Sequence, residues 1–392
     1  MPEALITPDV LRWARKRAQF TPDGAAQKVQ VRPERFIAWE EGNMYPTFRQ
    51  AKKLAKAFHV PFGYFFLPAP PKEKIDIPDL RTVGGQVRPD FSLEFIDLYH
   101  DILRNQEWFR EYRLQEGIRP LSFIGKFSVD SDCKEVANDI RQKLAIDDQL
   151  RISSRNWEHF ITRLIEQAEK TGILVFRNSI VGNNTHRPLS VDEFRGLAIS
   201  DPIAPLIFIN SRDAKSAQIF TLAHELAHLW IGESGVSNPV LKTKKNGNHE
   251  QKIESFCNKT AAELLVPEDE FLSDWDQEVS SQDNITFLSK KYRVSTLVIA
   301  RRGYDLNLLS YDEFREFYLD ALHYDRRVKA RLSESDGGPG SFTLQKMRHG
   351  SLFSRAVTTA AFEGRLPLRD GAALLGIKPA RLKKYADFLA GK

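Results

Sequence analysis

Two histidines with a glutamate between them form the pattern in this chain with the most explicit chemistry. His224, Glu225 and His228 lie in the run FTLAHELAHLW. On an α-helix, positions i and i+4 differ by about 40° around the axis and about 6 Å along it, so both imidazoles leave the same face. His224 and His228 can therefore hold one Zn²⁺, while Glu225, about 100° further round, can take a proton from water at the metal. The pattern predicts a metal-dependent peptide hydrolase.

The residues around this motif argue against an accidental match. Short His-Glu-x-x-His patterns do occur by chance, and a histidine pair satisfied by other polar groups in a core is the alternative. Leucine, alanine and tryptophan surround the three polar residues, which predicts a largely buried helix. An imidazole pair without a metal would need other polar partners there, so the context favours a metal site.

A catalytic zinc site needs a third protein ligand and an open position for water. Glu254 is our candidate, because it lies early in the segment 253–267, whose apolar residues recur at helical spacing before a terminal proline. The polar stretch Gly232–His249 is expected to form the loop that turns the chain back toward the first helix.

Other acidic and imidazole groups compete for the third position. His249 and Glu250 are rival ligands, and Glu263 is a weaker one because it lies beside a leucine pair expected to face the core. A solvated surface charge is the alternative for Glu254 taken by itself.

Three runs together resemble the ImmA/IrrE family of metallopeptidases, which are gluzincin-like zinc enzymes often fused to an Xre-type DNA-binding domain. The runs are FRGLAISDPIAPLIFIN (194–210), FTLAHELAHLWIG (220–232) and IESFCNKTAAELLVP (253–267). The resemblance covers about 173–267 and implies that His224, His228 and Glu254 are zinc ligands and Glu225 is the general base. Cys257 departs from the family, which commonly has a small residue such as alanine there. A lone buried cysteine behaves as a small hydrophobe, so the ligand set is unaffected.

Short apolar segments before the motif predict a small sheet packed on the histidine helix. They are rich in branched and aromatic residues, are bounded by turn-forming residues, and span 172–177, 194–200 and 205–210. In zinc peptidases of similar layout, the edge of such a sheet can hold an extended substrate by strand addition. A purely structural role is the alternative for any one strand.

The first seventy residues predict a separate set of short helices. Helix-start signals stand at Thr7, Thr21, Pro33 and Thr47, each followed by apolar residues at helical spacing. Short helices joined by tight turns suit a helix-turn-helix domain, whose second motif helix enters the major groove of DNA.

The run VRPERFIAWEEGNMYPTFRQAKKLAKAFHVP (31–61) resembles the Xre/Cro-type family. The resemblance places the stretch from Arg32 to Trp39 at DNA, with Glu34 and Arg35 near base edges or phosphates. A helical bundle that contacts only proteins is the alternative, because this geometry does not by itself guarantee DNA binding. Charge favours DNA, since residues 1–70 hold eleven Lys plus Arg against six Asp plus Glu, a net +5 that equals that of the whole chain.

The C-terminal segment is also basic. Residues 341–392 hold ten Lys plus Arg against three Asp plus Glu, which leaves a net −7 for the part between the two basic ends. The segment 364–385 resembles a second small helix-turn-helix unit, with Gly376 at the turn and Pro379 opening the next helix. A packing hairpin with a solvated basic face is the alternative.

Length and composition set outer bounds on the protein class. A chain of 392 residues with 42% hydrophobic content is expected to form two to three globular domains. Two cysteines exclude a disulfide framework and favour a reducing compartment. No apolar run reaches bilayer length, and the N-terminus lacks the apolar core of a signal peptide. We therefore expect a cytoplasmic protein with no membrane partner.

The expected fold class is α+β and mainly helical. A proline-containing linker at 68–74 and a glycine-rich break at 333–340 suggest the boundaries. The predicted parts are a five-helix helix-turn-helix domain (1–70), a linker and helical lead-in (71–171), a zincin-like peptidase domain with a small mixed sheet (172–332), and a small basic helical unit (341–392). Helical periodicity in 92–118 and 130–171 predicts the helices of the lead-in. The stretch 77–82 resembles one found in fused family members, and we expect it to be a packing loop.

Two functional hypotheses follow. The first is a DNA-binding transcriptional regulator whose zinc-dependent endopeptidase domain cleaves a repressor or another regulatory protein. The second is a non-catalytic antitoxin or autorepressor of a toxin-antitoxin operon that uses the peptidase fold to bind a partner or ligand. The expected partners are operator duplex DNA and a protein substrate or partner such as a repressor or toxin, and homodimerisation stays open.

Overall fold

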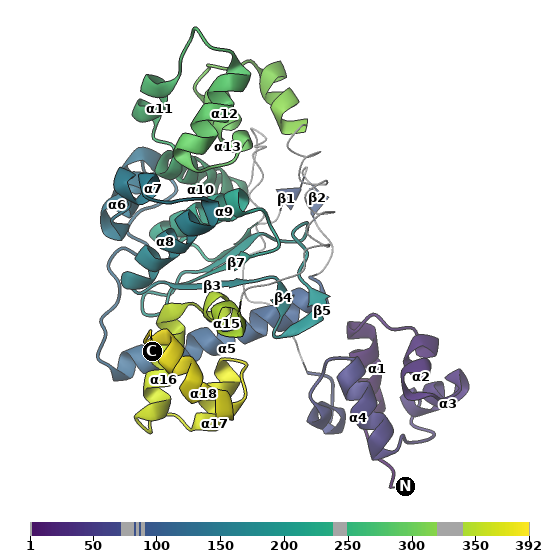
Figure 1. The fold of residues 1–392 in the computed structure, drawn as a ribbon. Coiled ribbons are helices and arrows are strands. Elements are labelled where there is room, and N and C mark those ends of the chain that lie inside the picture. The colour runs from purple at the N-terminus through teal and green to yellow at the C-terminus, as the bar shows by residue number, and fades with distance from the viewer. Residues whose placement is uncertain are drawn as a thin grey trace. The chain divides into compact units, whose positions relative to one another are not determined.

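The computed structural model describes residues 2–71, 91–237, 249–319 and 340–391, together with the backbone of 82–83 and 86–87 (Figure 1). The chain divides into two compact units, Met1–Asp76 and Ile77–Lys392. Four segments discussed above lie partly or wholly outside the described residues: the linker 68–74, the stretch 77–82, the loop 232–249 and the break 333–340.

The first unit contains short helices that begin where the sequence signals them. They are α1 (Pro8–Arg17), α2 (Pro22–Val29), α3 (Pro33–Glu40), α4 (Phe48–Ala57) and the 3-10 helix η1 (Phe62–Phe66). Thr21 and Thr47 act as N-caps, accepting the N–H groups of Gly24 and Gln50. The fifth helix that the sequence predicts is therefore a short 3-10 segment.

Helix α3 turns one face to the core and the other to solvent. Arg32, at its N-cap, and Glu34 and Arg35, in its first turn, are exposed. Trp39 is only 1% exposed, and its ring packs against that of Phe36 at a centroid distance of 5.8 Å. The expectation that Trp39 lies at DNA is therefore wrong, because its large apolar surface is used to fill the core of the unit.

The second unit is built around a four-stranded mixed sheet with the strand order β3-β7-β6-β8. The strands are β3 (Leu174–Asn178), β6 (Gly196–Ile199), β7 (Leu206–Asn210) and β8 (Gly235–Ser237). β3 runs parallel to β7, whereas β6 is antiparallel to both of its neighbours. The small mixed sheet and the mainly helical α+β class are thereby confirmed, while β8 and the hairpin β4 (Ile180–Val181) to β5 (Asn184–Pro188) were not predicted.

Helices cover both faces of this sheet (Figure 1). On one side lie α8, α9 and α10, and on the other lie α5, α15 and α16. Their bounds are α5 (Leu93–Gln115), α8 (Trp157–Lys170), α9 (Lys215–Ile231), α10 (His249–Leu265), α15 (Ser341–His349) and α16 (Ser351–Phe362). Further described helices are α6 (Cys133–Leu144), α7 (Asp148–Ile152), α11 (Glu268–Asp274), α12 (Ser281–Tyr292), α13 (Thr296–Asp305), α17 (Leu368–Leu374), η2 (Pro379–Arg381) and α18 (Leu382–Leu389), and residues 311–319 are helical as well.

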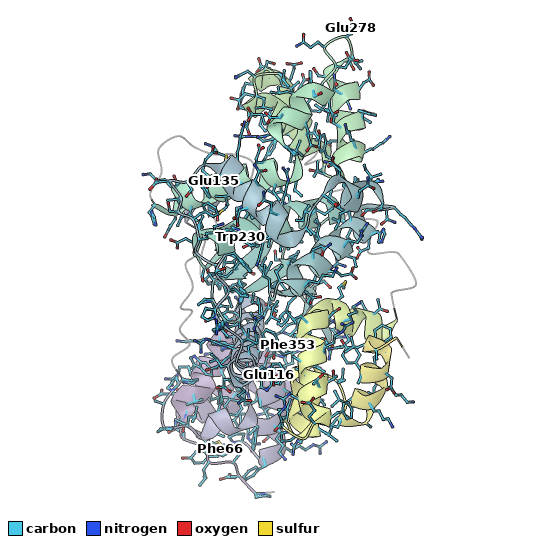
Figure 2. All side chains as sticks on the ribbon, turned by 90° about the vertical axis from the view of Figure 1, so that its left-hand side faces the viewer. Phe66, Glu116, Glu135, Trp230, Glu278 and Phe353 are labelled. Atoms are coloured by element: carbon cyan, nitrogen blue, oxygen red, sulfur yellow. The ribbon has the colours of Figure 1, made fainter. Side chains whose placement is uncertain are left out.

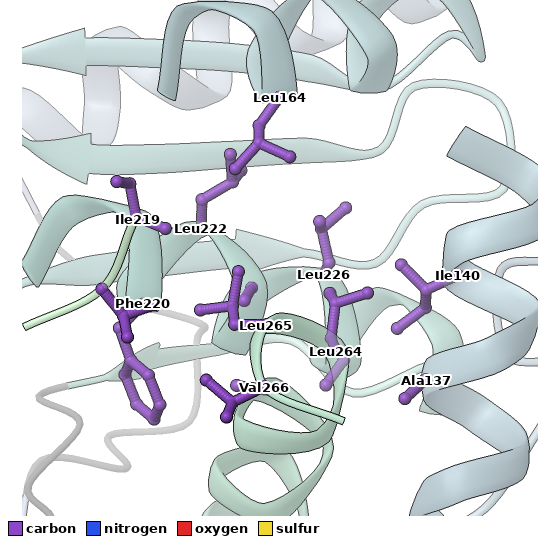
Figure 3. Close-up of a cluster of buried hydrophobic side chains, with 14 of the residues drawn as sticks. Ala137, Ile140, Leu164, Ile219, Phe220, Leu222, Leu226, Leu264, Leu265 and Val266 are labelled. Carbon is purple, nitrogen blue, oxygen red and sulfur yellow. The ribbon is translucent and has the colours of Figure 1, made fainter. Parts of the chain in front are cut away.

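Helix α9 is the central element of the core. Its apolar side chains form one core cluster with those of α6, α8 and α10, and Figure 3 shows Leu226 of α9 near Ile140 of α6 and Leu264 of α10. Full burial of each such side chain stabilises the fold by about 1.5–3 kcal/mol. The C-terminal end of α9 is also held, because backbone N–H groups of the loop before α6 donate to its last carbonyls, Gly125 to Leu229 at 3.0 Å and Phe127 to Trp230 at 3.0 Å.

The C-terminal helices dock on this framework through a buried carboxyl group. Glu169, near the end of α8, accepts the backbone N–H of Leu352 at 3.1 Å and so caps the start of α16. Gly350 makes this approach feasible, since its φ is +70° and a Cβ there would collide with the Glu169 carboxyl group. Next to the cap lies Phe353, which is labelled in Figure 2. Its ring packs against that of Phe176 on β3 at a centroid distance of 5.3 Å.

Among the described residues, no helix combines the length and the apolar character that a membrane span requires.

Titration of Glu169 is expected to couple the docking of α16 to pH. Burial raises the pKa of Glu169 from 4.5 to about 7, against the opposing effect of its backbone hydrogen bonds. Because the folded state holds the proton more tightly than the unfolded state, the free energy of unfolding should fall as pH rises from about 4.5 to 7 and then level off. In Glu169→Gln, which cannot titrate, the free energy of unfolding should lose up to about 3 kcal/mol less over this pH range. Comparing thermal unfolding midpoints at pH 5 and pH 8 for the two proteins measures the effect, and equal pH dependence would contradict it.

Candidate metal centre

Helices α9 and α10 bring three potential metal ligands to one point. His224 and His228 lie one turn apart on α9 and are fully buried, and Glu254 on α10 is 9% exposed. The two Nε2 atoms are 3.1 Å apart, and Oε1 of Glu254 lies 3.5 Å from that of His224 and 3.3 Å from that of His228. The sequence-predicted ligand candidates are therefore neighbours in space.

These distances fit a tetrahedral metal site. Ligand bonds of about 2.0–2.1 Å imply separations of about 3.3–3.4 Å between donor atoms at tetrahedral angles. Two imidazole nitrogens and one carboxylate oxygen are also a donor set used by catalytic zinc sites. Without a cation, two buried ring nitrogens would face each other at 3.1 Å, an arrangement that requires a proton or a metal between them.

The neighbouring imidazoles also keep the third ligand ionised. Burial opposes ionisation of Glu254, but the attraction of His224 and His228 and their hydrogen bonds outweigh it and hold its pKa at about 2. A carboxylate in this state is ready to coordinate a cation.

Asn258 orients the first histidine. Its Oδ1 lies 3.1 Å from Nδ1 of His224 and can accept the proton on that nitrogen, which leaves the Nε2 lone pair directed at the other ligands. Sequence reasoning did not assign Asn258 a role. The signal was its position four residues after Glu254, which places both side chains on one face of α10.

Glu225 is held beside the ligand cluster by two strands of the sheet. The Ser237 hydroxyl on β8 donates to Oε1 of Glu225, and Gly196 on β6 leaves the space that the carboxyl group fills, since a Cβ there would collide with Oε1. Its other oxygen, Oε2, is buried and has no partner among the described residues. Burial raises the pKa of Glu225 to about 8, which suits a group that accepts and returns a proton near neutral pH.

The rival ligands lie elsewhere. His249 and Glu250 are exposed in the first turn of α10 and are not part of the metal-ligand group found in the described residues. Glu263 is buried but forms an ion pair with Arg302. Cys257 is fully buried, and burial raises the pKa of its thiol well above the usual value, so it packs as a neutral apolar residue.

Comparisons with known proteins found a domain match that includes these residues. Residues 168–304 match the family model described as an IrrE N-terminal-like domain, and residues 350–388 match a domain of unknown function (DUF8813). The chain is similar to the radiation response metalloproteases IrrE of Deinococcus radiodurans, with 38% identity over 69 residues, and of Deinococcus deserti, with 40% over 68 residues. Each match covers 17% of this chain and 21% and 24% of the respective relative.

The chain therefore spans less than a quarter of the length of these curated relatives. The matches support the ImmA/IrrE family for the domain at 168–304. This is a metallopeptidase family, which implies a bound metal, and the group formed by His224, His228 and Glu254 fits that metal.

Loss of the Asn258 amide should weaken metal binding without removing a ligand. We expect Asn258→Ala to reduce metal affinity about 10–100-fold, because His224 is then free to rotate. Titration against a chromogenic chelator measures the affinity. Lys259→Ala, on the exposed side of the same helix, is the matched control and should bind metal as the wild type does; equal affinities for all three proteins would refute the orienting role.

Proposed function

We propose that this chain is a regulatory metalloprotease in which a zinc-dependent endopeptidase domain is joined to a DNA-binding helix-turn-helix unit. The observation that carries the enzymatic part is the convergence of two imidazoles and one carboxylate at 3.1–3.5 Å, with a second carboxyl group positioned beside them. The domain match and the similarity to IrrE metalloproteases support a protease of regulatory type.

Each residue of the site has a distinct role in peptide hydrolysis. His224, His228 and Glu254 would hold the Zn²⁺, and Asn258 would fix the orientation of the His224 imidazole. A zinc ion held there supplies Lewis-acid polarisation of water and of the scissile carbonyl group. Oε2 of Glu225 takes a proton from the attacking water and later delivers it to the leaving amine, while Ser237 anchors Oε1.

The non-catalytic alternative, an antitoxin or autorepressor, is not favoured. A domain that only binds a partner protein does not require a buried base next to a complete set of metal ligands. Glu225 is fully buried with one oxygen unpartnered in the described structure, an arrangement that destabilises the fold and is retained most simply for catalysis.

The geometry of the first unit supports the DNA-binding part of the proposal. α2 and α3 are joined by only three residues, and α3 presents Arg32, Glu34 and Arg35 to solvent. An exposed arginine pair at the start of the second helix of a helix-turn-helix motif is suited to phosphates or base edges. The net +5 of residues 1–70 adds sequence-independent attraction.

Replacing the base should separate metal binding from catalysis. We expect Glu225→Gln to keep about one zinc per chain and to lose proteolysis, because the amide cannot accept the proton, whereas His224→Ala should lose both. Metal content is measured by elemental analysis. Proteolysis is measured by comparing new peptide termini after incubating a cell lysate with each protein.

The lysate comparison also identifies the substrate, since peptides that appear with the wild type and not with Glu225→Gln mark the cleaved protein. Freshly purified wild-type protein without metal, or the same new termini with both proteins, would exclude the enzymatic proposal.

DNA binding by the first unit should depend on its exposed arginines. The combined change Arg32→Gln and Arg35→Gln should weaken binding to the region upstream of the gene and make it less sensitive to salt, because each phosphate that is no longer neutralised lowers the salt slope by about 0.9. Fluorescence anisotropy with a labelled duplex between 50 and 200 mM salt gives both quantities. Lys53→Gln, exposed on α4, is the control; an unchanged affinity of the double variant would contradict the assignment of α3.

A further inference from the structure

We propose that the C-terminal helices α16 to α18 form a second site for duplex DNA, which binds the phosphate backbone through Lys378, Lys383 and Lys384. This site lies in the second compact unit, on a segment that matches a domain of unknown function, and is separate from the DNA-binding unit proposed above.

The three helices make a small unit with its own core. α16 packs against both α17 and α18. The buried side chains come from all three helices and the turn between them: Phe353, Val357, Ala360, Ala361, Ala372, Leu375, Leu382 and Tyr385. α17 ends at Leu374, and after a four-residue turn η2 opens the second helical segment at Pro379. This is the sequence-predicted helix, turn and helix, with the second segment continuing into α18.

The side of this unit that faces the peptidase domain is already occupied. α15 packs on β3, and α16 packs on α8 and α5. At the edges, Arg365 pairs with Glu116, at the end of α5 (Figure 2), at 2.5 Å. The side chain of Asn183 donates to the carbonyl of Gly376 at 2.5 Å. These contacts fix the unit in place, and the exposed residues of α17 and α18 remain on the surface of the part of the chain that the structure describes.

That remaining surface concentrates positive charge. Lys378, Arg381, Lys383 and Lys384 lie within seven residues and are all exposed. Arg381 is held over the ring of Phe342 at 4.7 Å. No carboxylate forms an ion pair with any of the three lysines in the part of the chain that the structure describes, and the helical positions between and after them, Leu382 and Tyr385, point into the core. The lysine charges therefore remain available to an anionic partner.

Duplex DNA matches this surface better than an isolated anion does. Lys378 is the last residue of the turn, and Lys383 and Lys384 lie in the first turn of α18, which continues the second helical segment. This segment corresponds to the element that faces DNA in helix-turn-helix proteins. DNA presents about one negative charge per 1.7 Å of its axis, so several adjacent lysines can contact phosphates at once. The chain between its two basic ends has a net charge of −7, so attraction to DNA must come from these ends.

The test uses the full chain and a labelled 20-base-pair duplex of arbitrary sequence. The triple change Lys378→Gln, Lys383→Gln and Lys384→Gln is compared with wild type and with a matched control that neutralises three exposed lysines on other helices, Lys143→Gln, Lys170→Gln and Lys290→Gln. We expect the C-terminal variant to bind more weakly and to lower the slope of log affinity against log salt by about 0.9 for each phosphate that the substituted lysines no longer neutralise. The control should keep the wild-type slope, and thermal unfolding confirms that all proteins are folded.

Combining the variants separates this site from the one on α3. If the C-terminal change reduces binding in the Arg32→Gln and Arg35→Gln background as well, the second site is supported whatever the first unit does. An unchanged affinity and slope for the C-terminal variant in both backgrounds would overturn the inference, even if the first unit binds DNA. Weakened binding to a single-stranded RNA of equal length, with unchanged duplex binding, would overturn it in favour of another partner.

Discussion

The second unit has to accommodate ionisable side chains that are buried at the contact between α9 and α10. His224, Glu225 and His228 are fully buried on one helix, and Glu254 meets them from the other. Burying such groups in a low-dielectric core is costly unless each is paired. A divalent cation held by His224, His228 and Glu254 would offset that cost and join the two helices. The centre of the fold and the centre of its proposed chemistry are therefore the same place.

The surrounding elements limit how these groups can move. Backbone hydrogen bonds from the preceding loop hold the end of α9, Asn258 fixes one imidazole, and Ser237 and Gly196 confine the Glu225 carboxyl group from the sheet side. β6 and β8 therefore position a residue of the site in addition to forming the sheet. This packing provides the precise placement that the proposed catalytic role of Glu225 requires.

The basic ends of the chain flank a more acidic middle. The candidate metal centre lies in that middle of the sequence, whereas the two helical regions with exposed cations lie toward the termini. For the proposed DNA binding, this distribution directs the attraction for phosphates to the two ends of the chain. The capping of α16 by Glu169 adds a rigid connection between the C-terminal helices and the sheet.

The sequence by itself determined the parts of the fold and the site that depend on local pattern. The spacing of His224 and His228, the helical periodicity around Glu254 and the apolar runs of β3, β6 and β7 all follow from side-chain type and backbone geometry. The helix starts of the first unit follow in the same way from prolines and capping threonines.

Only the tertiary structure decided which residues from distant segments meet. Glu254 and its rivals His249 and Glu250 have similar sequence signals, but of these three described residues helix packing brings Glu254 alone to the imidazoles. Ser237 lies on a three-residue strand, which is too short to carry a periodic pattern. Trp39 has an amphipathic side chain, so whether it is buried depends on the residues that surround it in space. Local chemistry specifies helices and candidate ligands, but contacts between remote segments are set by how the core is filled.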